Sequence, residues 1–86
     1  MHLKTAIQKY LNELPDCFFF PTKNTKCSLV GCVRGKLVCM LILETNRRPN
    51  KQEISFSARI LQNGGEHYVI RTLEDVCEIS KAKGWL

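Results

Sequence analysis

The run "LVCMLIL" at 37–43 constrains the fold more than any other part of the chain, because it has no polar side to present to water. A strand with one solvated face alternates apolar and polar residues, whereas a continuous apolar run is typical of a strand buried on both faces. The run belongs to a strand predicted at 36–43, which follows another apolar strand at 28–33. Arg34-Gly35 between them predicts a tight hairpin turn. The centre of the domain is therefore expected to be a hairpin covered by other elements.

The remaining elements follow from helical periodicity and from stop signals. We predict a helix at 3–14, a short strand at 17–20, a helix from Asn50 to Gly64, a strand at 66–71 and a last helix after Thr72. The order α-β-β-β-α-β-α contains a strand–helix–strand crossover, so the strand at 66–71 is expected to lie parallel to an earlier one. The predicted fold class is α/β (α+β), a single domain of residues 1–86 with a mixed central sheet and flanking helices.

Both later helices begin with a capping-box pattern. In this pattern a short polar residue and an acidic residue three positions later each bond the other's backbone N–H. The two pairs are Asn50 with Glu53 and Thr72 with Asp75. The pattern predicts where these helices start.

Length and composition restrict the class of protein. Eighty-six residues, of which 44% are apolar, can build one modest core, and dimerisation is a natural way to bury more surface. No apolar run reaches the roughly 18 residues that a membrane helix needs, and no export signal is visible. Five cysteines without a C-x-x-C pair predict free thiols in a reducing compartment. We therefore expect a cytoplasmic homodimer without contact to membranes.

The net charge of +5 is unevenly distributed. Residues 1–51 hold nine Lys and Arg against three Asp and Glu, whereas residues 52–86 hold four against five. Many of the basic residues fall in predicted loops and turns near the second and third strands: Lys23, Lys26, Arg34, Lys36, Arg47, Arg48 and Lys51. Such residues contact nucleic-acid phosphates without reading sequence, although loop charges can also serve only for solvation. They are the predicted nucleic-acid-binding residues.

The stretch 28–76 carries a set of short motifs that point to one family. They are Leu29-Val30-Gly31, Gly35-Lys36, Gly64-Gly65, Val69, Arg71 and the block Thr72-Leu73-Glu74-Asp75-Val76. With these motifs the chain resembles the small, phage-type VRR-NUC proteins of the PD-(D/E)XK nuclease superfamily over about residues 3–80. The resemblance implies a restriction-endonuclease-like core, a dimer and a metal-dependent nuclease site near DNA.

The catalytic positions of that family are degenerate in this chain. Alignment without gaps places the family's Asp on Ser28, its Glu on Leu41, its Lys on Leu43 and its helix Gln on Glu53. Leucine offers no oxygen to a divalent cation, which requires oxygen ligands. The resemblance therefore implies a nuclease fold without catalysis, metal or cofactor. Glu44, at the strand end, would reach the Lys position only through a bulge.

Two further side chains are given ordinary structural roles. His67, at the start of a strand, is expected to be a surface group without a general-base function. Trp85, near the C-terminus, is expected to pack back on the domain.

Two functions from different classes follow. The first is a catalytically inactive, phage-encoded binding protein that acts in the bacterial host cytosol. Its partner would be nucleic acid or a host nucleic-acid-handling complex, as for an anti-CRISPR or other anti-defence inhibitor. The alternative is a metal-dependent, structure-specific DNA endonuclease with a rearranged site that uses Glu44, Glu53 or a partner subunit. A cleavage assay with magnesium or manganese discriminates the two.

Overall fold

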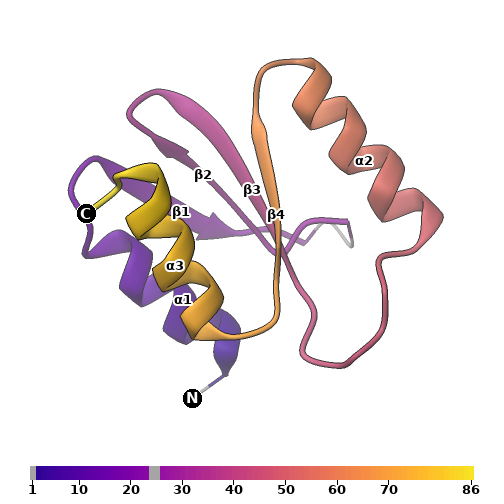
Figure 1. The fold of residues 1–86 in the computed structure, drawn as a ribbon, viewed down its shortest axis with the longest axis horizontal. Helices are drawn as coiled ribbons and strands as arrows, with labels where there is room; N and C mark the ends of the chain where they lie inside the picture. The colour runs from indigo at the N-terminus through magenta and orange to yellow at the C-terminus, as the bar shows by residue number, and fades with distance from the viewer. Residues whose placement is uncertain (1, 24–25) are drawn as a thin grey trace.

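The computed structural model describes residues 2–23 and 26–86. In that part of the chain three helices accompany a four-stranded mixed sheet, as shown in Figure 1, which confirms the predicted mixture of helices and strands. The elements are α1 (Leu3–Asn12), β1 (Cys17–Pro21), β2 (Leu29–Val33), β3 (Lys36–Ile42), α2 (Lys51–Gln62), β4 (Glu66–Ile70) and α3 (Leu73–Lys83).

The four strands lie in the order β1-β2-β3-β4. The β1–β2 and β2–β3 pairs are antiparallel. The β3–β4 pair is parallel, because α2 carries the chain back to the end of the sheet at which β3 begins. Arg34 and Gly35 have φ values of 53° and 86°. Two consecutive residues with positive φ form the turn that matches the twist of a hairpin. The predicted hairpin and the predicted parallel strand are both confirmed.

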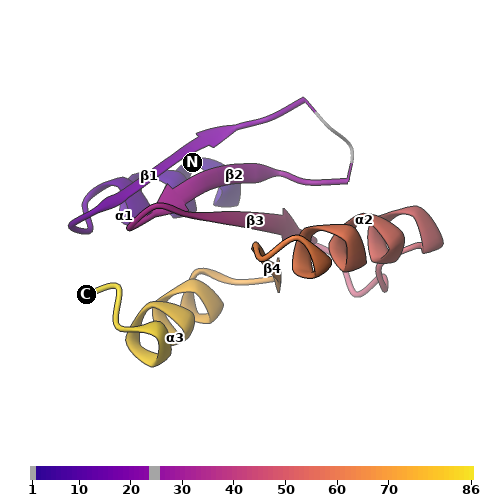
Figure 2. The same ribbon diagram turned by 90° about the horizontal axis from the view of Figure 1, so that it is seen from above.

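The main core lies on one face of the sheet, under α1 and α3. Figures 1 and 2 show these two helices on the same side and α2 on the other. The core consists of Ile7, Leu11, Phe19, Leu29, Val33, Val38, Met40, Ile70, Val76 and Trp85. Trp85 is buried against Phe19 and Tyr68, so its predicted packing is confirmed.

β3 buries side chains on both faces, as its apolar sequence predicts. Val38 and Met40 point into the main core, and Cys39 and Leu41 are buried on the opposite side. Leu43, just beyond the strand, is also buried and donates its N–H to the carbonyl of Ile70 over 2.9 Å. From Val38 onward most of the apolar residues of this stretch are therefore packed inside the domain, whereas Leu37 at its start is exposed.

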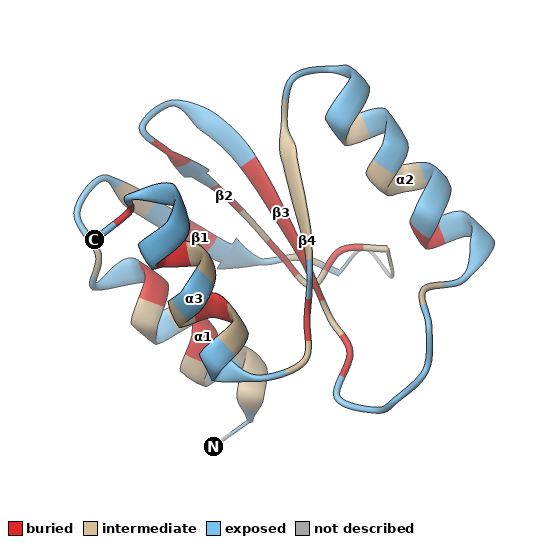
Figure 3. Cartoon of the chain, in the orientation of Figure 1, coloured by how far each residue is buried: buried red, intermediate tan, exposed pale blue. Residues whose placement is uncertain are grey.

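The second face is covered only in part, because α2 packs mainly against β4. Alternation along the strands and the pairing register put five residues on the uncovered part, which we call the open face: Phe18, Phe20, Val30, Cys32 and Leu37. Phe18 is 64% exposed, Phe20 45% and Leu37 42%. Figure 3 shows the contrast between buried and exposed segments of the sheet.

The helix ends follow local chemistry. Both predicted capping boxes are present, at Asn50 with Glu53 and at Thr72 with Asp75. α1 ends at Asn12, two residues before the predicted end, since the Asn12 side chain binds both the N–H and the carbonyl of Phe19, at 2.7 and 3.0 Å. Among the described residues no helix has the length and apolar character needed to cross a bilayer.

Candidate functional site

The positions expected to have lost their metal ligands lie together on the face opposite the main core. Leu41 and Leu43 are each only 3% exposed. The Ser28 hydroxyl accepts a hydrogen bond from the Ile42 backbone N–H over 2.9 Å, and so stabilises the end of the β2–β3 pair. The structure thus gives Leu41 and Leu43 a packing role and Ser28 a backbone-binding role.

Glu53 is occupied by structural partners. Its two carboxylate oxygens accept from the two terminal nitrogens of Arg47, at 2.8 and 2.9 Å. One of them also accepts from the backbone N–H of Asn50 at 2.8 Å. The Arg47 guanidinium, followed by the Asn50 N–H, lowers the pKa of Glu53 to about 2. The Glu53 carboxylate is therefore engaged by Arg47 and by the start of α2, whereas Glu44 is exposed.

No group of three or more His, Cys, Asp or Glu side chains within residues 2–23 and 26–86 is arranged to hold a metal ion.

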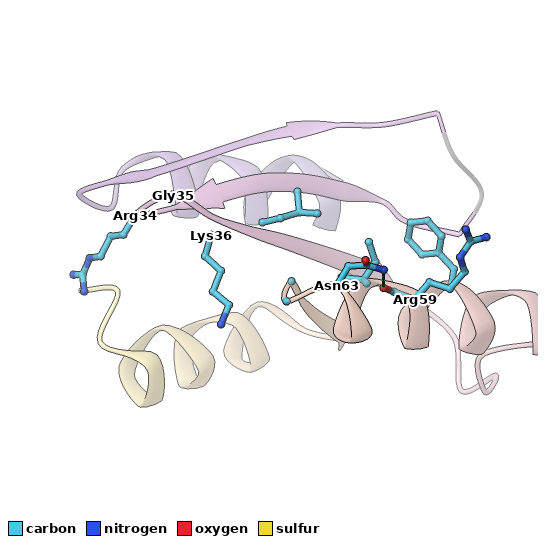
Figure 4. Close-up of a pocket in the computed structure, with 10 residues that line it drawn as sticks. Arg34, Gly35, Lys36, Arg59 and Asn63 are labelled. Carbon is cyan, nitrogen blue, oxygen red and sulfur yellow. Dashed lines mark hydrogen bonds between the residues drawn. The ribbon is translucent and has the colours of Figure 1, made fainter.

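A hollow with a volume of about 750 Å³ lies between α2 and the start of β3. Figure 4 shows it with the hairpin turn at one end and α2 along its side. Leu37 on β3 and Phe56 and Ile60 on α2 are its apolar residues. Gly65 closes the end of α2, where a Cβ would meet a methyl carbon of Ile60 at 2.8 Å. Glycine there lets the chain pass close beneath the helix.

A smaller hollow of about 280 Å³ continues along α2 and shares Phe56 and Arg59 with the first. Its other lining residues include Lys26 and Lys51. We call the two hollows together the α2 groove. Its floor is apolar and its rim carries amide, hydroxyl and cationic groups.

The charged side chains that line the α2 groove are all cationic. No Asp or Glu is among the residues that line either hollow. Among the ion pairs of the described residues, none involves Lys51 or Arg59. With Lys26, these side chains form a cationic stretch along the helix. Such a stretch attracts a polyanion.

The predicted basic residues do not form one patch. Arg34 donates to the Gly84 carbonyl at 2.9 Å, and Lys36 pairs with Glu66 at 3.4 Å, so both reach toward α3 although they line the groove. Arg47 is held by Glu53. Lys23 and Arg48 are exposed in loops outside both hollows. Of the seven predicted residues, four line the α2 groove: Arg34 and Lys36 at the hairpin end, and Lys26 and Lys51 at the other end.

Arg59 is the groove residue that the sequence reasoning missed. It lies on α2, four positions after Ser55 and three after Phe56, so these three share one helix face. Lys51, Ser55 and Arg59 follow one another at intervals of four residues, and this helical spacing is the sequence signal that could have identified Arg59.

The expectation that His67 is an ordinary surface group is wrong. His67 pairs with Cys39 across the sheet and its ring contacts the edge of Phe56 on α2, with centroids 6.4 Å apart. Its Nε2 is buried and has no hydrogen-bond partner among the described residues. Burial lowers the pKa of His67, and the Glu53 carboxylate opposes that shift in part. The parallel pairing of β4 under α2 is what covers it.

Comparison of the chain with protein-family models, curated proteins and solved structures finds no match. The resemblance to the VRR-NUC proteins therefore stays a prediction from the sequence.

Proposed function

We propose that this protein binds nucleic acid through the α2 groove and does not cleave it. The observation that carries the proposal is the row of Lys26, Lys51 and Arg59 along a groove that no carboxylate lines. The net charge of +5 acts in the same direction at longer range.

The chemistry of these groups sets the kind of binding expected. Lysine and arginine side chains on a groove contact phosphates and release condensed counterions. Such contacts position a nucleic acid without reading its bases. The affinity should therefore fall steeply as salt is added and depend little on base sequence.

Binding is preferred to cleavage because of the residues at the degenerate positions. Leu41 and Leu43 are buried and offer no oxygen to a cation. Glu53 already accepts three hydrogen bonds from Arg47 and Asn50. The VRR-NUC resemblance, with its restriction-endonuclease-like core, forms part of the proposal. A sheet in which β4 lies parallel to β3 is compatible with that core.

Fluorescence anisotropy of a labelled DNA at several salt concentrations tests the proposal. The variant Lys51→Ala/Arg59→Ala removes two groove cations. Lys9→Ala/Lys81→Ala, on the helices of the covered face, is the matched control, because both variants reduce the net charge from +5 to +3. We expect a loss of roughly tenfold or more, and a salt slope smaller by about 2, in the groove variant alone. Equal losses of affinity in both variants would mean that overall charge, and not the groove, causes the effect.

A nicking assay on plasmid and branched DNA with magnesium or manganese tests the alternative. Nicking that disappears in Glu44→Ala or Glu53→Ala, and is absent from a mock preparation, would replace this proposal by the endonuclease one.

The biological setting proposed from the resemblance is interference with a bacterial nucleic-acid-handling or defence system. A pull-down from host lysate, with and without added nuclease, tests it. Loss of all recovered material after nuclease treatment supports nucleic acid as the partner. Stoichiometric retention of one host protein would instead make the chain a protein-binding inhibitor.

A further inference from the structure

Two phenylalanines on β1 are left outside the core. Phe18 and Phe20 alternate with Phe19, so Phe19 enters the core and its two neighbours point to the open face. Their ring centroids are 5.8 Å apart and the rings are tilted by 40°. At 64% and 45% exposure, each ring leaves aromatic surface accessible. Exposed neighbouring aromatics on a sheet are a surface that can bind flat apolar groups.

The pairing register connects these rings to the α2 groove. Phe18 pairs with Cys32, and Cys32 pairs with Leu37, which lines the groove. Strands lie about 4.8 Å apart, so Phe18 on β1 and Leu37 on β3 are separated by roughly 10 Å across the sheet.

A second row of residues leads from the open face to the underside of α2 through Cys39, which is buried. Phe20 pairs with Val30, and Val30 with Cys39. Cys39 pairs in turn with His67, whose ring touches Phe56 of the groove. The row through Leu37 therefore joins the open face and the α2 groove into one continuous surface, apolar and aromatic on β1 and cationic along α2.

Resting on the proposed function, we propose that the ligand is a single strand of nucleic acid. Its bases stack on Phe18 and Phe20, and its backbone follows Lys26, Lys51 and Arg59. A single strand presents both phosphates and open base faces, and aromatic side chains beside a basic groove bind this combination with little dependence on sequence. In a duplex the base faces are already stacked on each other, so only the phosphates remain for the groove.

Charge argues against a second copy of the chain as the occupant. A two-fold dimer formed through this surface would place the same patch on both sides. The cations of one α2 groove would then approach those of the other with no carboxylate in either hollow to offset them. Asp16 lies outside both hollows and lines a third one together with Phe18 and Arg34.

The test compares anisotropy titrations of a labelled oligothymidylate and of a duplex of equal length. The chain variants are Phe18→Ala/Phe20→Ala, Phe18→Leu/Phe20→Leu, which keeps apolar bulk without an aromatic face, and Lys51→Ala/Arg59→Ala. Ile54→Ala/Leu61→Ala removes two equally exposed apolar side chains from α2 outside the groove and serves as the matched control. Trp85 lies in the main core, so its fluorescence reports folding separately from binding.

We expect the native chain to bind the single strand about tenfold or more tightly than the duplex. Both phenylalanine double variants should lose about tenfold to a hundredfold of single-strand affinity, with duplex binding changed less than about twofold. The groove variant should weaken both ligands, and the Ile54→Ala/Leu61→Ala variant should weaken neither.

Unchanged single-strand affinity in the phenylalanine variants, with loss of both ligands in Lys51→Ala/Arg59→Ala, would overturn the stacking surface and leave the proposed function standing. Failure of the native chain to bind either ligand would overturn the proposed function itself. If light scattering shows a dimer that the phenylalanine variants dissociate while single-strand binding is unchanged, the open face is a subunit interface and the inference is wrong.

Discussion

The two faces of the sheet carry similar apolar side chains and bury them very differently. On one face α1 and α3 cover Phe19, which is fully buried. On the other, α2 packs mainly against β4, so Phe18 and Phe20 on β1 stay exposed. Three consecutive residues of one type thus differ in burial because of which helix lies above them. Burial in this domain is decided by coverage rather than by hydrophobicity.

The difference has an energetic consequence. Full burial of a phenylalanine stabilises a protein by about 1.5–3 kcal/mol, and Phe18 and Phe20 leave 64% and 45% of their surface exposed, so about half of that stabilisation is unused in the isolated chain. The same surface is therefore available to a ligand. The covered face contributes stability and the open face contributes binding capacity.

The largest expected difference between the two faces comes from truncating neighbouring phenylalanines, one on each face. Phe19→Ala should destabilise the domain by about 3–5 kcal/mol, because it leaves a cavity in the main core. Phe20→Ala should cost only about 1 kcal/mol, because 45% of this side chain is already exposed. Urea unfolding followed by circular dichroism measures both. Similar losses at the two positions would mean that the open face is buried in solution.

A second comparison uses β3, which spans both environments. Leu41→Ala should cost about 2–4 kcal/mol, because this side chain is buried. Leu37→Ala, on the open face of the same strand, should cost less than about 1 kcal/mol. Thermal unfolding of the two variants under identical conditions gives the difference. A near-neutral Leu41→Ala would show that the degenerate position is not part of the packing.

The smallest expected effect concerns acid stability at the helix that partly covers the open face. The pKa of Glu53 is lowered from 4.5 to about 2 in the folded chain, so its stabilising contribution is fully present above about pH 4.5 and is lost as the pH falls toward 2. Glu53→Gln should flatten the pH dependence of stability in that window.

Asp75→Asn provides the counterpart on the covered face. The N–H groups of Arg71 and Thr72 bind this carboxylate and lower its pKa. Asp75→Asn should therefore flatten the acid limb as well. Urea midpoints between pH 2 and 6 measure both variants. An unchanged acid limb in Glu53→Gln would mean that the Arg47–Glu53 pair does not persist in solution.

The fold could be predicted from local patterns to a large extent. Helical periodicity, the Arg34-Gly35 turn and the two capping boxes depend on residues close in sequence, so the elements were found with boundary errors of one or two residues. The degenerate positions Leu41 and Leu43 could be expected to lie on one side of the sheet, because residues two apart on a strand share a face.

The candidate site could be predicted only in part, because it depends on contacts between distant segments. Lys26 and Lys51 meet at the α2 groove because α2 crosses back over the sheet, whereas Arg47 is taken up by Glu53 and Lys36 by Glu66. Arg59 gained its place beside them from the same packing. The sequence does not distinguish one basic loop residue from another. They can be distinguished only when the structure shows which of them pair with a carboxylate.

By itself, the sequence determined the elements and the need of β3 for cover on both faces, since these depend on side-chain alternation and local hydrogen bonds. Only the tertiary structure decided how much cover each face receives. The position of α2 over β4 buries the Nε2 of His67 and leaves Phe18 and Phe20 exposed. Helix placement results from the packing of residues far apart in the chain, which local patterns do not contain.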